Sequence, residues 1–262
     1  MAEEIKEAYV KTEHDNGIAT IEFFHPQSNS LPGKILNELA DAIQKEGENT
    51  DTQLIILRSA GEKIFCAGAS FDELAAITNE EEGLQFFSGF AKVINAMRMA
   101  PKFIIARIQG KCIGGGVGLA AAADYAIAVE GSEIKLSELA VGIGPFVVGP
   151  AVERKLGLSA FSQLTIDATM WRSADWARRK GLFAELHPDV VGMDTSIKRL
   201  ANTLANSSPD AMREIKKVLW KGTEHWDTLL KERAAISGRL ILSNHSKSFI
   251  EKFKATKPAS TK

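Results

Sequence analysis

The stretches Cys66-Ala67-Gly68-Ala69-Ser70 and Gly114-Gly115-Gly116-Val117-Gly118 are two glycine-rich turns, each between an apolar strand-like run and a helix-like run. Backbone N–H groups at the start of a helix have no partner within it, and the helix dipole adds positive charge there. Two such turns can aim two N–H groups at one carbonyl oxygen and stabilise it as it becomes an enolate. The pair therefore predicts an oxyanion hole formed by the backbones of Ala69 and Gly115, although turn geometry alone explains most single glycines.

Neither turn has the sequence of a nucleotide-binding loop. No Gly-Lys-Ser or Gly-Lys-Thr follows either turn, and the second turn, read through Leu119, lacks the last glycine of a dinucleotide fingerprint. A nucleotide-cofactor enzyme is therefore disfavoured.

Around these turns the chain resembles the crotonase family, also called the enoyl-CoA hydratase/isomerase family, and the resemblance covers nearly its whole length. The first turn resembles the family's Ala-Gly-Ala-Asp, with Ser70 in place of Asp, and the second resembles Gly-Gly-Gly-x-Glu, with Gly118 in place of the first catalytic glutamate. The stretch Leu136–Gly142 resembles the segment with the second glutamate, which places that carboxylate at Glu138. Two shorter matches, to Pro-x-x-Asn-Ala-Leu and Phe-x-Glu-Lys, lie near the ends of the chain at residues 24–31 and 249–252.

The resemblance implies an enzyme that acts on an unsaturated acyl-CoA thioester, with Ala69 and Gly115 as oxyanion donors and Glu138 as general acid or base. Without the resemblance, a solvated charge or a helix-cap partner is the favoured interpretation of Glu138. Its apolar neighbours would nevertheless raise the pKa of a carboxyl and suit it to proton transfer near neutral pH. In this family two glutamates usually hold the water for hydration, whereas moving a double bond needs one base. Gly118 therefore favours isomerisation. Hydration of an enoyl-CoA, including a branched methylglutaconyl-like one, hydrolysis or decarboxylation of a thioester, and non-catalytic acyl-CoA binding are the alternatives.

The resemblance also implies contacts to the coenzyme A part of the substrate, at Ser70, Phe71, Asp72, Phe249 and Lys252. Ser70 is equally suited to a helix N-cap, and Phe249 with Lys252 to a solvated helix face with one anchoring aromatic ring. In the family the last two positions often reach coenzyme A from a neighbouring subunit, and the common assembly is a homotrimer or a hexamer of two trimers. Coenzyme A enters as part of the substrate, so neither a separate cofactor nor a metal is expected.

The composition narrows the choice of partner and compartment. The chain has 262 residues, 45% of them apolar, and a formal net charge of -1. It therefore has no strong positive electrostatic field that would attract nucleic acid. Cys66 and Cys112 lie beside apolar runs and are predicted to be reduced core thiols. No apolar run approaches the roughly 18 residues that span a bilayer, and the first residues show no targeting pattern. We therefore expect a cytoplasmic protein with no membrane partner.

Strand and helix patterns alternate over the first two thirds, and helical patterns dominate from about Gly149. A hairpin is expected from Lys6–Val10 and Ala19–Phe24 across Asp15-Asn16-Gly17, and a helix capped by Asn29-Ser30 is expected from Pro32 to about Lys45. Further strands are expected at 54–59, 64–67, 103–108 and 125–129, and further helices at 78–99, with Thr78 and Glu81 as a capping box, and at 119–123.

The predicted fold class is α/β. By resemblance it is a crotonase-type spiral core of ββα units over residues 1–200, followed by a C-terminal helical region over residues 201–262.

Overall fold

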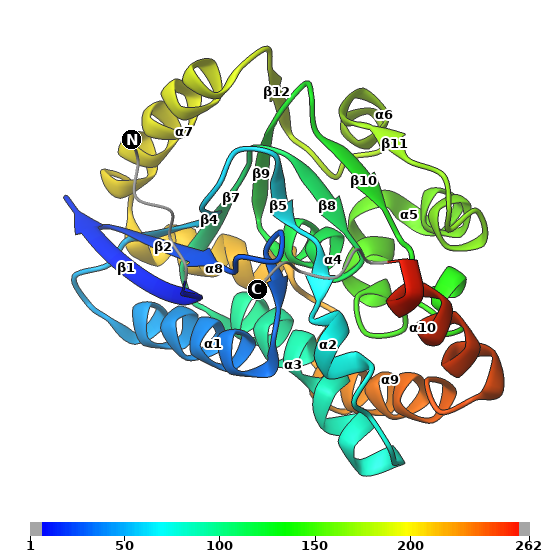
Figure 1. The fold of residues 1–262 in the computed structure, drawn as a ribbon. Coiled ribbons are helices and arrows are strands. Elements are labelled where there is room, and N and C mark those ends of the chain that lie inside the picture. Colours follow the sequence, from blue (N-terminus) through cyan, green and yellow to red (C-terminus); the bar gives the residue numbers. More distant parts are fainter. Residues whose placement is uncertain (1–6, 257–262) are drawn as a thin grey trace.

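The computed structural model describes residues 7–256, which form a mixed α/β fold (Figure 1). Within these residues the largest sheet has six strands, and only its first pair is antiparallel. Its strands, in spatial order, are β1 (Tyr9–Asp15), β2 (Ile18–Phe24), β4 (Leu54–Ser59), β7 (Phe103–Ile108), β9 (Tyr125–Val129) and β12 (Glu185–His187).

A smaller four-stranded sheet runs beside it and holds the segments that reach the glycine turns. Its strands, in spatial order, are β11 (Arg172–Ser173), β10 (Glu133–Lys135), β8 (Lys111–Ile113) and β5 (Ile64–Cys66). A two-stranded ladder joins β3 (Ser30–Leu31) to β6 (Gly68–Ala69). The chain thus passes repeatedly from a large-sheet strand to a small-sheet strand and then to a helix. This repeated ββα order confirms the predicted fold class.

Helices cover the sheets and fill the C-terminal part. They are α1 (Gly33–Glu48), α2 (Phe71–Leu74), α3 (Glu80–Met99), α4 (Gly115–Ala122), α5 (Gly149–Ile166), α6 (Ala174–Arg179), α7 (Val190–Ala205), α8 (Pro209–Leu219), α9 (Trp226–Leu240) and α10 (Asn244–Thr256), with the 3₁₀ turn η1 (Leu139–Val141) before α5. No helix within residues 7–256 is long and apolar enough to cross a membrane.

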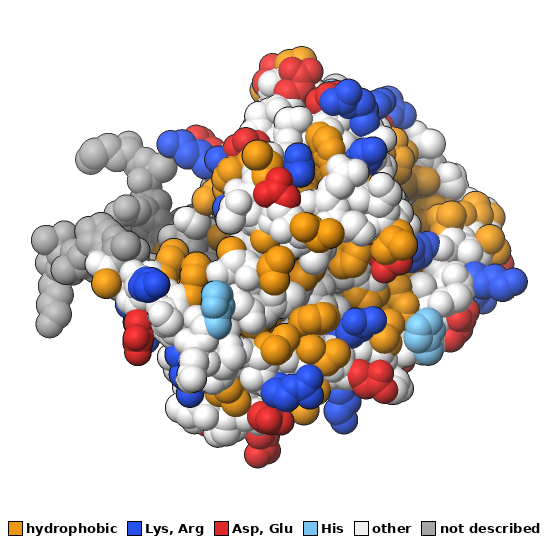
Figure 2. Space-filling model, turned by 90° about the vertical axis from the view of Figure 1, so that its right-hand side faces the viewer, with side chains coloured by type: hydrophobic (Ala, Val, Ile, Leu, Met, Phe, Trp, Pro, Cys, Tyr) orange, Lys and Arg blue, Asp and Glu red, His pale blue; other side chains and the backbone are white. Residues whose placement is uncertain are grey.

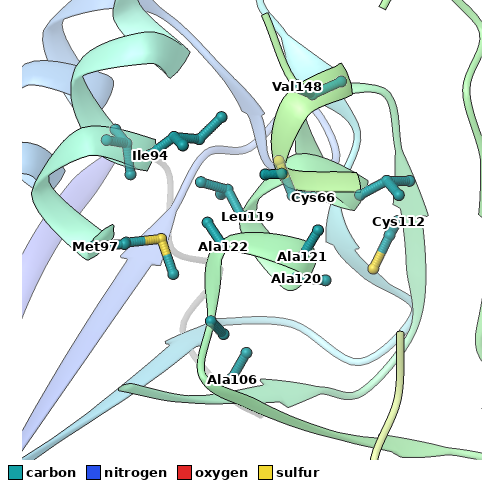
Figure 3. Packing of buried hydrophobic residues seen from close by; sticks show 14 of the residues in the cluster. Cys66, Ile94, Met97, Ala106, Cys112, Leu119, Ala120, Ala121, Ala122 and Val148 are labelled. Atoms are coloured by element: carbon teal, nitrogen blue, oxygen red, sulfur yellow. The ribbon is translucent and has the colours of Figure 1, made fainter. Parts of the chain in front are cut away.

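The central helix α4 lies in the middle of the core. All eight of its residues are buried, and its glycines and alanines let neighbouring elements approach closely. Figure 3 shows Leu119 to Ala122 surrounded by Cys66, Cys112, Ile94 and Val148. Both cysteines are free and wholly buried, as the sequence predicts. The second half of α4 is therefore fixed by packed side chains.

The predicted strands at 54–59, 103–108 and 125–129 have the observed bounds. The first strand of the hairpin is longer than predicted, since it ends at Asp15 and not at Val10. Asn16 and Gly17, both with positive φ, make a tight turn that lets the two strands pair up to it. Of the predicted Lys6–Val10, Lys6 lies outside the described residues.

Two helix starts differ from the prediction in the residue at the N-cap. Asn29 does not cap α1, since its side chain accepts from His25 N at 2.8 Å and donates to Ala60 O at 2.9 Å, and Pro32 is the N-cap. The cap of α3 is Asn79, one residue after Thr78, and its side chain accepts from Glu82 N.

The helix predicted at 119–123 begins four residues earlier, at Gly115. The second glycine turn thus leads directly into a helix N-terminus, which brings the unpaired N–H groups of that end to the turn itself.

The described part of the C-terminal helical region packs directly on the core. Helix α9 lies against α3 so closely that a Cβ added to Gly83 would be 2.6 Å from Gly238 Cα. Helix α8 inserts Lys216, 3% exposed, toward Asp124 at the end of α4. Residues beyond 200 therefore take part in the same packed structure as the spiral.

Candidate functional site

A cavity of about 750 Å³ lies where the two glycine turns meet. Its wall includes residues of both turns, of α2 and α3, of the segment around η1 and of α10. Most of the wall is apolar, and among the described residues that form it only two carry charge, Lys135 and Glu138. The cavity is large enough for a small-molecule ligand.

The two turns are in direct contact. Gly68 has φ +89°, and a Cβ added there would lie 3.1 Å from Ile113 O and 3.5 Å from Gly115 N. The backbone at residue 69 is fixed by β3, because Ser30 Oγ donates to Ala69 O at 2.9 Å. Glycine at position 68 is thus required both by the backbone conformation and by the close approach of the second turn.

The second turn places Gly115 at the first position of α4. Gly114, with φ +51°, is the N-cap, and its N–H donates to Lys135 O at 2.9 Å. Its carbonyl accepts the first helical bonds, from Val117 N and Gly118 N. Ala69 and Gly115 both line the cavity, so the structure brings the two predicted donors to one space. That their N–H groups hold a carbonyl oxygen stays a prediction.

The ring of Phe90 occupies the space in which a side chain at position 115 would lie. A Cβ added to Gly115 would be 2.2 Å from Phe90 Cζ, and Phe90 is only 6% exposed. We expect Gly115→Ala to displace the backbone at position 115 and lower kcat at least tenfold, because an oxyanion donor that shifts loses much of its effect. Steady-state kinetics on the accepted acyl-CoA measures this.

Two further variants test that cause. Gly131→Ala is the matched control, since nothing lies within 4 Å of its added Cβ, and it should keep full activity. Phe90→Leu in the Gly115→Ala background should recover part of the rate by making room. Full activity in Gly115→Ala would contradict a role for this backbone in the reaction.

Glu138 lies just before η1, with its carboxyl turned toward the second glycine turn. Its Oε1 is 2.9 Å from the position of a Cβ added to Gly114. The residue as a whole is partly exposed, whereas Oε2 is buried and has no hydrogen-bond partner among the described residues. Burial disfavours the charged form and raises the pKa of Glu138 to about 7. The carboxyl is therefore suited both to accept and to return a proton at neutral pH.

Gly118 lies in a filled part of the core, not beside an open space. A Cβ added there would be 2.5 Å from Val148 Cγ1 and 2.8 Å from Val148 Cβ. Gly118 is buried and is not part of the cavity wall. Val148 thus takes the room beside the position at which the family's first glutamate is expected. Among the described residues that line the cavity, Glu138 is the only carboxylate.

Of the five residues expected to contact coenzyme A, Phe71 and Phe249 line the cavity and the other three do not. Ser70 is buried and caps α2 by accepting from Glu73 N, which is the alternative that the sequence left open. Asp72 is exposed and accepts from Gln27 Nε2 at 2.9 Å, and Gln27 itself lines the cavity. Lys252 is exposed on α10.

Sequence reasoning missed part of the aromatic wall. Phe253 lines the cavity, with its ring centroid 4.2 Å from that of Phe71 and 6.3 Å from that of Phe249. Phe87 and Phe90, three residues apart on α3, also line it. Their helical spacing was a usable signal, because residues three apart share a helix face.

Comparisons with known proteins agree with this fold. A short-chain-enoyl-CoA hydratase of Clostridium acetobutylicum is 28% identical over 92% of this chain and 94% of its own length. The mitochondrial methylglutaconyl-CoA hydratase of Homo sapiens is 30% identical over 75% of this chain and 58% of its own length. An enoyl-CoA hydratase from Bacillus halodurans, 22% identical, has the same fold, with a TM-score of 0.86 over 93% of this chain and 99% of that chain.

The match to the family model for enoyl-CoA hydratase/isomerase extends over residues 13–257, nearly the whole chain. It includes both glycine turns and Glu138. The chain therefore belongs to the enoyl-CoA hydratase/isomerase family.

Proposed function

We propose that the protein moves the double bond of an unsaturated acyl-CoA. The observation that carries this proposal is the single carboxylate, Glu138, in a cavity whose wall also contains Ala69 and Gly115. The thioester oxygen accepts hydrogen bonds from the backbone N–H groups of Ala69 and Gly115. Ionised Glu138 removes a proton from a carbon of the acyl chain, the electron pair moves onto the oxygen as an enolate, and protonated Glu138 returns the proton to another carbon. Coenzyme A enters with the substrate, and the reaction needs no metal and no separate cofactor.

The pKa of Glu138 supports the proposal. A group with a pKa of about 7 is present in both protonation states near neutral pH. One such group can act first as base and then as acid, because the two steps use its two states in turn. Phe71, Phe249 and Phe253 provide an apolar surface for the coenzyme A side of the substrate.

Hydration of an enoyl-CoA is the second candidate, and the names of the relatives favour it. Two of the similar proteins are an enoyl-CoA and a methylglutaconyl-CoA hydratase. Against it, the described residues of the cavity wall include one carboxylate, whereas hydration in this family usually uses two glutamates. An acyl-CoA binder without activity would keep the cavity but gain nothing from the raised pKa of Glu138.

One experiment separates the three functions. The protein is incubated with 2-enoyl-, 3-enoyl- and branched unsaturated acyl-CoA thioesters, and the products are followed by mass spectrometry and absorbance. Isomerisation leaves the mass unchanged and moves the double bond, whereas hydration adds one water. No change with any thioester would leave the binding function. We expect isomerisation, and efficient hydration without isomerisation would contradict the proposal.

The packing at Gly118 gives a further prediction. Gly118→Glu supplies the carboxylate that is usual at this position in the family, but the Cβ of the new side chain would overlap Val148. We therefore expect no gain of hydration and a loss of folding stability of at least about 1–3 kcal/mol, as for other overpacked cores. Urea unfolding and hydratase assays measure both. The control is Gly131→Glu, where the added side chain meets open space, and a stable hydratase from Gly118→Glu would refute the packing argument.

We also propose that the protein assembles as a homotrimer or hexamer. Large apolar side chains are exposed on α5, α7 and α8, including Ile166 at 76%, Val191 at 75% and Val218 at 72%. Figure 2 shows hydrophobic side chains interspersed with charges of both signs on the face it presents. Light scattering should give a mass three or six times that of the chain. A monomer at all concentrations would contradict the assembly and any contact of Phe249 or Lys252 with a neighbour's substrate.

A further inference from the structure

Lys135 is the only cation among the described residues that line the cavity. It is the last residue of β10, so its side chain points to the opposite face from the buried Ile134 and Leu136. Its carbonyl accepts the Gly114 N–H at 2.9 Å. Lys135 therefore adjoins the turn that carries Gly115 and lies three residues before Glu138.

An aromatic ring, and not a carboxylate, accompanies the ammonium group of Lys135. Its Nζ lies 4.4 Å from the centroid of the Trp171 ring. Lys111 Nζ lies 4.5 Å from the same ring but is also 2.8 Å from Glu133 Oε2. Within residues 7–256 Lys135 Nζ has no ion pair and no side-chain hydrogen bond. It is thus a positioned charge without a counter-ion at the cavity wall.

Lys135 and the residues expected to contact coenzyme A come from different elements of the wall. Trp171 closely follows Ala168 and Thr169, which line the cavity with Lys135. Phe71 lies on α2 and Phe253 on α10, and both line the same cavity. Coenzyme A against Phe71 and the reacting carbons beside Glu138 would let the far end of the acyl chain reach the part of the wall that contains Lys135.

We propose that Lys135 binds a second carboxylate at the far end of the acyl chain, so that the substrate is the coenzyme A thioester of an unsaturated dicarboxylic acid. This inference rests on the proposed function and specifies its substrate class. An anion beside Lys135 neutralises the unpaired charge through a charge-assisted hydrogen bond. A purely apolar chain would leave that charge unpaired. An acyl-CoA carries a second kind of anion that a lysine can bind, the phosphates of coenzyme A. The test below distinguishes a carboxylate of the acyl chain from a phosphate.

The test measures binding, by calorimetry, of saturated dicarboxylic acyl-CoA thioesters and of monocarboxylic thioesters of equal chain length. We expect the full-length protein to bind the best dicarboxylic thioester at least about tenfold more tightly than its monocarboxylic partner, or about 1.4 kcal/mol. Lys135→Met keeps the length of the side chain and removes the charge, so it should abolish the preference and leave monocarboxylic binding unchanged. Lys135→Arg should retain the preference.

Lys111→Met is the matched control, because Lys111 contacts the same ring but its charge is already paired with Glu133. It should keep the preference. Equal binding of both thioester classes by the unaltered protein would overturn the inference. An equal loss of both classes in Lys135→Met would also overturn it, since Lys135 would then hold a phosphate. Saturated thioesters undergo neither isomerisation nor hydration, so a Lys135-dependent preference without isomerase activity would contradict only the proposed function.

Discussion

Glu138→Gln is expected to lower kcat by at least about 10²-fold, the effect typical of a general acid or base, while acyl-CoA binding survives. The amide keeps the shape of the side chain but cannot take a proton from carbon. No other carboxylate lines the cavity within the described residues, so nothing nearby can replace it. Steady-state kinetics and calorimetry with a saturated acyl-CoA measure the two effects separately.

The control is Glu80→Gln, which changes an exposed carboxylate at the start of α3 in the same chemical way. It should retain full activity. Full activity in Glu138→Gln as well would refute the proton-transfer mechanism, whichever reaction the protein catalyses.

The same substitution gives a pH dependence with a defined sign. Because burial raises the pKa of Glu138 from 4.5 to about 7, the folded protein holds this proton more tightly than the unfolded chain does. Its contribution to the free energy of unfolding is complete below about pH 4.5 and is lost as the pH rises through about 7, by at most about 3 kcal/mol. Glu138→Gln should therefore be more stable than the unaltered protein at pH 8, with the difference vanishing at pH 4. The activity of the unaltered protein should rise through pH 7, where the base ionises.

Local sequence was enough to predict the buried strands. Leu54–Ser59 and Phe103–Ile108 are dense in Ile and Leu, and they are central parallel strands with both faces covered. Both glycine turns were equally clear, because positive φ at Gly68 and Gly114 leaves few alternatives to glycine. The helix caps were harder to predict, because neighbouring residues can compete for the N-cap position. Thr78 and Asn79 are both good N-caps, and the bond from Glu82 N decides between them.

The cavity wall depends on contacts between residues far apart in the sequence, which local patterns do not record. Val148 fills the space beside Gly118 from thirty residues away. Phe253 reaches the ring of Phe71 from the far end of the chain. No sequence motif marks Lys135. Its position follows only from the pairing of β10 with β8 and from the contact of its ammonium group with the Trp171 ring. Glu138 was found because a family motif marks it, and its raised pKa agrees with the apolar neighbours visible in the sequence.

The ion pair between Lys216 and Asp124 joins the C-terminal helices to the core, and breaking it should have the largest effect on stability. Lys216 Nζ donates to Met97 O at 2.9 Å, to Lys102 O at 2.7 Å and to Asp124 Oδ2 at 2.9 Å, so all its protons are used. Asp124 also accepts from Trp220 Nε1 at 2.8 Å. Helix α8 is thereby tied to the ends of α3 and α4.

Lys216→Met is expected to lower the free energy of unfolding by about 3–5 kcal/mol, because it leaves the carboxylate of Asp124 buried without its counter-ion. Urea unfolding followed by circular dichroism measures the loss. Lys217→Met is the control, since Lys217 is exposed and paired with the exposed Glu214. This variant should change stability by less than about 0.5 kcal/mol. Asp124→Asn combined with Lys216→Met should cost less than the sum of the two single changes, because the first removes the charge that the second leaves unpaired. Equal stability of the Lys216 and Lys217 variants would show that the helices beyond residue 200 are held to the core by apolar packing alone.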